Sequence, residues 1–121
     1  MTPPAETGGT GPADRSARPV LDLLGLAARA RGLAFGTDMV RKAIRNGEVA
    51  RVILAADTSA TQLKKLVPLL EARGIPHHIT LSQMELGTAT GRGPVSAIGI
   101  VHQGFARRAG ELLAALPSQQ D

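Results

Sequence analysis

Apolar residues in the first half of the chain recur at the spacing of one helix face. There are two stripes of this kind: Leu21, Leu24 and Ala28, and then Val40, Ala43 and Ile44. The first follows Pro19, which suits the first turn of a helix, and it is closed by Gly32. The spacing therefore predicts helices over residues 19–31 and 37–46.

Unbroken apolar runs alternate with these helices. Runs at residues 52–56 and 95–101 are typical of strands covered on both faces, and shorter candidate strands lie at 33–35 and 77–81. Further helices are predicted over residues 59–73, from Ser82 onward, and over 104–116. The alternation predicts an α/β protein, a three-layer α/β/α sandwich with a small mixed β-sheet.

Two local signals refine the later helices. Ser82 and Glu85 have the spacing of a capping box, which predicts a helix start there. Pro68 lies inside the helix predicted over residues 59–73, where it can kink the helix or divide it in two. Asp57 ends a strand, and we expect it to cap the next helix rather than to form a site.

The N-terminal residues differ from the rest of the chain. Residues 1–18 contain three prolines, three glycines, three threonines and almost no bulky apolar side chain. This composition predicts a disordered tail over 1–18, a folded domain over 19–117 and a short C-terminal tail over 118–121. Deleting the N-terminal tail should then leave thermal stability unchanged.

Charge is concentrated in one stretch of the sequence. The net charge of +4 equals the excess of six basic over two acidic residues between Arg29 and Arg51. A localised excess of this kind attracts a polyanion better than evenly spread charge. No bulky apolar anchors accompany it, which argues against a membrane surface.

The helix over residues 37–46 carries part of this charge. Its polar face presents Asp38, Arg41, Lys42 and Arg45, and its first turn follows Gly36. The unpaired N–H groups of a helix N-terminus suit an anion such as phosphate. The pattern fits a nucleic-acid-binding helix, and it also fits an ordinary amphipathic helix with a solvated charged face.

Several other classes of site are disfavoured. The chain has no cysteine, and neighbouring His77 and His78 point to opposite faces of a strand, so we expect no metal site. No nucleophile, base and orienting acid form a recognisable set, and no cofactor motif is present. Two phenylalanines are the only aromatic residues, which disfavours modules that stack bases on a sheet of aromatics.

Four segments, taken in order and spacing, resemble the ribosomal protein L7Ae family, which binds kink-turn RNA. They are GTDMVRKAIRNGEVARVILAAD (36–57), LLEARGIP (69–76), MELGTATGRG (84–93) and VSAIGIVHQGFA (95–106). Within the family, LLGLAARAR (23–31) and GFA (104–106) look like the bacterial YlxQ-type branch. The resemblance implies a non-enzymatic RNA-binding protein of the cytoplasm, without a cofactor, in a ribosomal or ribonucleoprotein setting.

The family's first RNA contact corresponds to the start of the helix over residues 37–46. Gly36 and Lys42 match the family, but Asp38 stands where it usually has Asn and Met39 where it often has Glu. The resemblance implies that Lys42, Arg41 and Arg45 contact phosphates, that Gly36 and Thr37 offer backbone N–H groups, and that Asp38 meets a base edge. Asp38 lacks the amide's donors, and Met39 can accept almost nothing.

The family's second contact is a loop near the start of the last strand. Here it corresponds to Thr90, Gly91, Arg92, Gly93, Pro94 and Val95, which we expect to close over nucleotides.

Two other functions stay open. The departures at Asp38 and Met39 favour a domain that recruits a protein partner, with RNA binding weak or lost. The second alternative is a small enzyme that acts on RNA, because similar domains are fused to ribose methyltransferases. No cofactor-binding domain follows the sandwich here, which leaves little room for catalysis.

Overall fold

The computed structural model describes residues 12–116, and the side chains of residues 17–116. The described helices are α1 (Pro12–Arg29), α2 (Thr37–Arg45), α3 (Ala60–Arg73), α4 (Gln83–Ala89) and α5 (Gln103–Ala114). The strands are β1 (Leu33–Phe35), β2 (Arg51–Leu54), β3 (His77–Ile79) and β4 (Ala97–Ile100). Each predicted helix and strand is present, with ends that differ by a few residues except at the start of α1.

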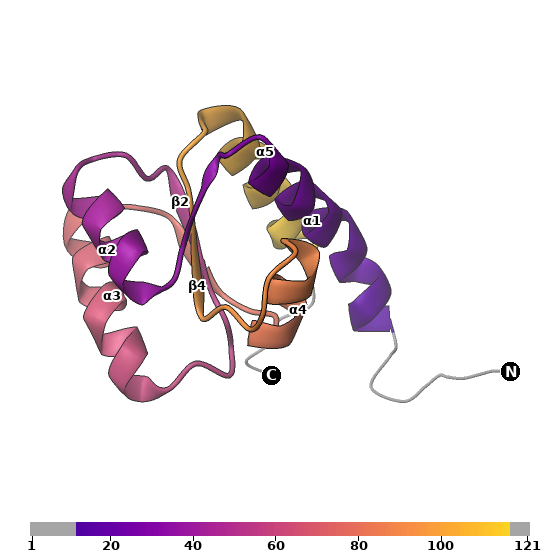
Figure 1. Cartoon of the computed structure of the whole chain (residues 1–121), viewed down its shortest axis with the longest axis horizontal. Coiled ribbons are helices and arrows are strands. Elements are labelled where there is room, and N and C mark those ends of the chain that lie inside the picture. The colour runs from indigo at the N-terminus through magenta and orange to yellow at the C-terminus, as the bar shows by residue number, and fades with distance from the viewer. Residues whose placement is uncertain (1–11, 117–121) are drawn as a thin grey trace, which may run out of the picture.

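The four strands form one sheet in the order β1-β4-β2-β3. Strand β4 is antiparallel to both β1 and β2, whereas β2 and β3 are parallel, so the sheet is mixed as predicted. Helices α2 and α3 cover one face, and α1, α4 and α5 cover the other (Figure 1). The three-layer α/β/α sandwich is therefore confirmed.

Each face of the sheet has its own apolar core. Along β2, Ile53 faces α1, α4 and α5, while Val52 and Leu54 face α2 and α3. The same alternation holds in β4, where Ile98 and Ala97 belong to opposite cores. Because both faces are covered, these strands have unbroken apolar sequences.

The local signals of the later helices have clear outcomes. Ser82 and Glu85 form the predicted capping box at the start of α4. Helix α3 continues through Pro68 without dividing, and it ends at Gly74 in the left-handed conformation that glycine favours. Asp57 does not cap α3, which is capped by Ser59; its Oδ1 accepts the N–H of Gln83, 3.0 Å away, at the start of α4.

The predicted boundary of the N-terminal tail is wrong. Helix α1 begins at Pro12, so Pro19 lies inside it rather than in its first turn. Ala17 is only 2% exposed and packs in the core with Val20 and Leu24. The three share one helix face, and this extends the apolar stripe past Pro19. Residues 1–11 and the predicted C-terminal tail lie outside the described residues.

Deletion of residues 1–18 should therefore lower the melting temperature. The deletion removes Ala17 and uncovers Val20, which is fully buried in the intact protein. We expect a loss of about 1–2 kcal/mol, or several degrees in the midpoint of a thermal melt followed by circular dichroism. An unchanged midpoint would mean that the N-terminal turns of α1 do not contribute to the core.

Candidate nucleic-acid interface

Helix α2 is fixed at its start by strand β4. Gly36, the N-cap, has φ 87° and ψ 156°, a conformation essentially restricted to glycine. Its N–H donates to the Ala97 carbonyl at 2.9 Å, and the Thr37 hydroxyl lies 3.3 Å from the Ser96 hydroxyl. No side chain caps this helix start, so its first-turn N–H groups remain open to an external acceptor.

The other end of α2 is held by α3. The Arg73 guanidinium donates to the carbonyls of Ile44 and Arg45, at 3.2 and 3.4 Å. The Ile44 carbonyl also accepts the Gly47 N–H, and the two bonds from Arg73 tie the end of α2 to α3. Helix α2 is therefore positioned at both ends before any ligand arrives.

Between these ends α2 presents two distinct faces. Val40 and Ile44 are fully buried, while Asp38 and Met39 are exposed at the helix start. The α2 basic face consists of Arg41, Lys42 and Arg45, which line a shallow groove with Asp38 and Asn46. Among the side chains of residues 17–116, none forms an ion pair with this face. Lys42 and Arg45 are exposed and Arg41 is half-buried, so this face can meet an anionic ligand.

A hollow opens beside the start of α2. This α2–α3 hollow is lined by Phe35, Gly36, Thr37, Asp38, Met39, Asp57, Thr58, Ser59, Gln62, Lys65, Gln83 and Ser96. No pattern in the sequence indicates that Ser59, Gln62 and Lys65 belong to this site. They come from a different helix and reach the hollow only through the packing of α3 beside α2. Gly36, Thr37, Asp38 and Met39, which the sequence analysis predicted as contacts, line the same hollow, and so does Asp57, which was expected only to cap a helix.

The loop between α4 and β4 folds back onto α4. The Arg92 N–H and the Thr90 hydroxyl both donate to α4 carbonyls, at 2.8 Å from Gly87 and Leu86 respectively. A Cβ at Gly87 would lie 2.0 Å from the Gly93 oxygen, so only glycine allows this contact. The loop is consequently held against α4.

The Arg92 guanidinium connects this loop to the start of α2. It lies over the Phe35 ring, 3.9 Å from the centroid, in a cation–π arrangement. Phe35 immediately precedes Gly36 and lines the α2–α3 hollow. The two predicted contact segments are therefore neighbours in space. Gly91, Gly93 and Pro94 are exposed beside Arg92.

Two of the predicted contacts do not fit the structure. The Gly36 N–H is already bonded to Ala97 and cannot serve a ligand. Val95 is 6% exposed, packs in the core and donates its N–H to the Gln83 carbonyl. Thr37 is only 8% exposed, and its hydroxyl lies against that of Ser96.

The basic stretch of the sequence is divided in space. Arg51 points away from the α2 basic face, and its Nε donates to the Ala106 carbonyl at 2.8 Å while its Nη1 lies 2.8 Å from His78 Nε2. Gly110 makes room for it, since a Cβ there would lie 2.6 Å from the Arg51 Cζ. Arg29 lines a groove between α1 and α4. Charge counted along the sequence therefore overstates the charge of any one surface.

The Arg51–His78 contact makes stability depend on pH. Arg51 can only donate, so Nε2 of His78 must carry a lone pair and the ring must be neutral. Burial, together with the charge of Arg51, lowers the pKa of His78 from its ordinary value of 6.5. The contribution of His78 is therefore complete above about pH 6.5 and is lost as the pH falls through its lowered folded-state pKa.

Two measurements check this expectation. An NMR titration of the His78 ring should give a midpoint below 6.5, and urea unfolding should show falling stability as the pH is lowered through that midpoint. Replacement by Gln, which can still accept from Arg51, should flatten the slope. A midpoint at or above 6.5 would mean that the contact with Arg51 does not persist in solution.

Other classes of site find no support in the described part of the chain. No cluster of three or more His, Asp or Glu side chains there could hold a metal ion. No helix between residues 12 and 116 is long and apolar enough to cross a bilayer. His102 instead caps α5, its Nδ1 accepting the N–H groups of Gly104 and Phe105.

Two curated bacterial proteins resemble the chain over most of its length. RNA-binding protein YlxQ of Bacillus subtilis (strain 168) is 35% identical over 91 residues, which cover 75% of this chain and 91% of that protein. RNA-binding protein YlxQ of Enterococcus faecium is 32% identical over 93 residues, which cover 77% and 89%. Each likeness covers about three quarters of the chain.

Solved structures show the same fold. A Bacillus halodurans C protein of unknown function has a TM-score of 0.76 and 39% identity, covering 78% of this chain and 96% of that one. The Giardia lamblia 15.5kD RNA binding protein has a TM-score of 0.69 and 21% identity, covering 88% and 89%.

Residues 19–109 match the model of the ribosomal protein L7Ae/L30e/S12e/Gadd45 family. The match includes all of α2, the α2–α3 hollow and the loop before β4, and it supports the expectation that the chain is not an enzyme. The chain belongs to the ribosomal protein L7Ae/L30e/S12e/Gadd45 family, and within it resembles the YlxQ proteins.

Proposed function

We propose that this chain binds structured RNA of the kink-turn type, through the α2 basic face, the open N-terminus of α2 and the loop before β4. One observation carries the proposal: the Arg92–Phe35 contact brings that loop beside the uncapped helix start. Unpaired N–H groups and unpaired cations together form a surface suited to phosphate. The names of the YlxQ relatives support RNA as the ligand.

The residues have separate roles in this proposal. Lys42, Arg41 and Arg45 contact phosphates, while the backbone N–H groups of Thr37 and Asp38 meet an anion at the helix start. Asp38 also reaches a base edge, where its carboxylate accepts hydrogen bonds from guanine. Arg92 contacts the nucleotides nearest the loop. The setting we propose is a ribosomal or other ribonucleoprotein particle in the cytoplasm.

A direct binding experiment tests this function. A labelled RNA with a bulge and tandem guanine–adenine pairs is titrated with the protein, beside an RNA in which Watson–Crick pairs replace those pairs. We expect tighter binding to the first, with affinity falling steeply as salt rises. Equal and weak binding to both would favour the alternative that the departures at Asp38 and Met39 suggest, a domain recruiting a protein partner.

A further inference from the structure

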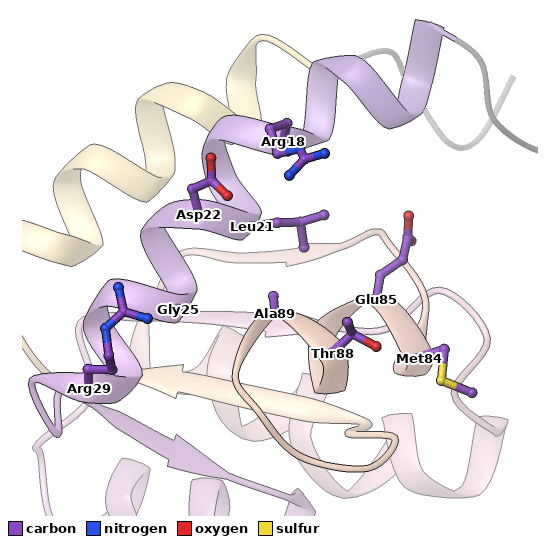
Figure 2. Close-up of a pocket in the computed structure, with 9 residues that line it drawn as sticks. All are labelled: Arg18, Leu21, Asp22, Gly25, Arg29, Met84, Glu85, Thr88 and Ala89. Carbon is purple, nitrogen blue, oxygen red and sulfur yellow. The ribbon is translucent and has the colours of Figure 1, made fainter.

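A second surface lies on the opposite side of the sheet from α2. Helices α1 and α4 enclose a groove of about 570 Å³, with Leu21 and Ala89 on its apolar lining and the side chain of Met84 at its rim (Figure 2). Met84 is 63% exposed, the largest exposed fraction among the bulky apolar side chains described. None of these residues belongs to the proposed RNA surface.

The shape of the groove follows from one close contact. A Cβ at Gly25 would lie 2.8 Å from the Ala89 oxygen, so α1 and α4 touch at this level. From there α1 rises away from α4 toward Arg18, and the groove widens (Figure 2). Its stretch of α1, from Arg18 to Arg29, is about 16 Å long, or about three helical turns.

Charged side chains frame the apolar lining in a fixed order. Along α1 the groove meets Arg18, then Asp22, then Arg29. No partner among the side chains of residues 17–116 forms an ion pair with any of them. Glu85 also lines the groove, but its carboxylate already accepts the Ser82 N–H in the capping box. The α1 rim thus offers an outward-facing plus–minus–plus pattern.

From this pattern we infer that the α1–α4 groove docks a short amphipathic helix of a partner protein. The helix places apolar side chains against Leu21, Met84 and Ala89, as a third helix packs between two others. The partner helix carries an acidic, a basic and an acidic side chain in that order, opposite Arg18, Asp22 and Arg29 respectively. Flexible methionine suits such a docking surface. The chain could then hold RNA on one side of its sheet and a protein on the other.

The test uses a defined peptide library. Fourteen-residue peptides with leucines at helical spacing, and with Glu, Lys or Gln at the remaining positions, are displayed and selected against the whole chain. We expect enrichment of the acidic–basic–acidic order over its reverse. The enriched peptides should bind the Arg29→Glu and Met84→Glu variants at least about 10-fold more weakly, as expected for central interface residues.

Matched controls separate docking from misfolding. Leu26 is 50% exposed on the same helix but outside the groove, so Leu26→Glu should leave peptide binding unchanged. Both groove variants should keep the wild-type melting temperature. No enrichment, enrichment without the charge order, or equal binding to Leu26→Glu and Met84→Glu would overturn the inference. So would competition by RNA, or a dimer in light scattering that Met84→Glu abolishes, since the groove would then serve RNA or a second copy.

Discussion

Replacing Arg41, Lys42 and Arg45 together by alanine should weaken RNA binding by about 100-fold, since each charge-assisted contact contributes about 1 kcal/mol or more. The three side chains form the α2 basic face and have no ion-pair partner among the described side chains. Their loss should be felt for every RNA sequence, because phosphates carry no base identity. Among the single variants, Lys42→Ala should cost most, since Lys42 matches the family position.

The salt dependence gives a second, independent readout. The slope of log affinity against log salt should fall by about 3 when three phosphate contacts are lost. The matched control replaces Lys64, Arg107 and Arg108, which are exposed cations outside the α2–α3 hollow and the α2 basic face. This control removes the same charge. Equal losses in both triple variants would show diffuse attraction without a site.

The Met39→Glu variant should stay folded and bind kink-turn RNA more tightly. Met39 is 57% exposed and lines the α2–α3 hollow, so it does not pack in the core, and a charged residue at this position should not disturb the fold. A glutamate at this position could accept hydrogen bonds from guanine N1–H and N2–H₂ groups, which methionine leaves unpaired. An unpaired buried donor costs about 1–3 kcal/mol, so we expect a gain of about 10-fold.

Specificity decides whether that gain comes from the intended contact. The gain should be large for an RNA with intact tandem guanine–adenine pairs and absent when Watson–Crick pairs replace them. Met84→Glu makes the same chemical change at an exposed methionine outside the hollow, and it should bring no gain. If Met39→Glu is folded but binds both RNAs equally weakly, kink-turn recognition is lost and recruitment of a protein becomes the better account.

Much of this architecture could be predicted because its signals are local. The stripe of Val40, Ala43 and Ile44 defines both a helix and its buried face, and the opposite face follows automatically. The unbroken apolar runs of β2 and β4 indicate strands covered on both sides. The helix start at Gly36 was predictable for the same reason, since it depends on consecutive residues.

The parts of the site that could not be predicted depend on contacts between residues far apart in the sequence. Ser59, Gln62 and Lys65 join the site only because α3 packs beside α2, a juxtaposition with no pattern in the sequence. Arg51 lies away from the α2 basic face because β3 pairs beside β2 and because its Nε donates to the Ala106 carbonyl of α5. A count of charges along the chain reveals neither the α3 residues of the site nor the position of Arg51.

Gly110 links two positions that lie far apart in the chain. A Cβ at position 110 would lie 2.6 Å from the Arg51 Cζ, so a side chain there would shift the guanidinium from its position beside the Ala106 carbonyl and His78. Selection should therefore act on the two positions as a pair. Among relatives with this fold, we expect arginine at position 51 to occur with glycine at position 110, and bulkier residues at 110 to occur with shorter ones at 51. A change at position 51 or 110 that looks conservative by itself would then be tolerated only together with the matching change at the other position.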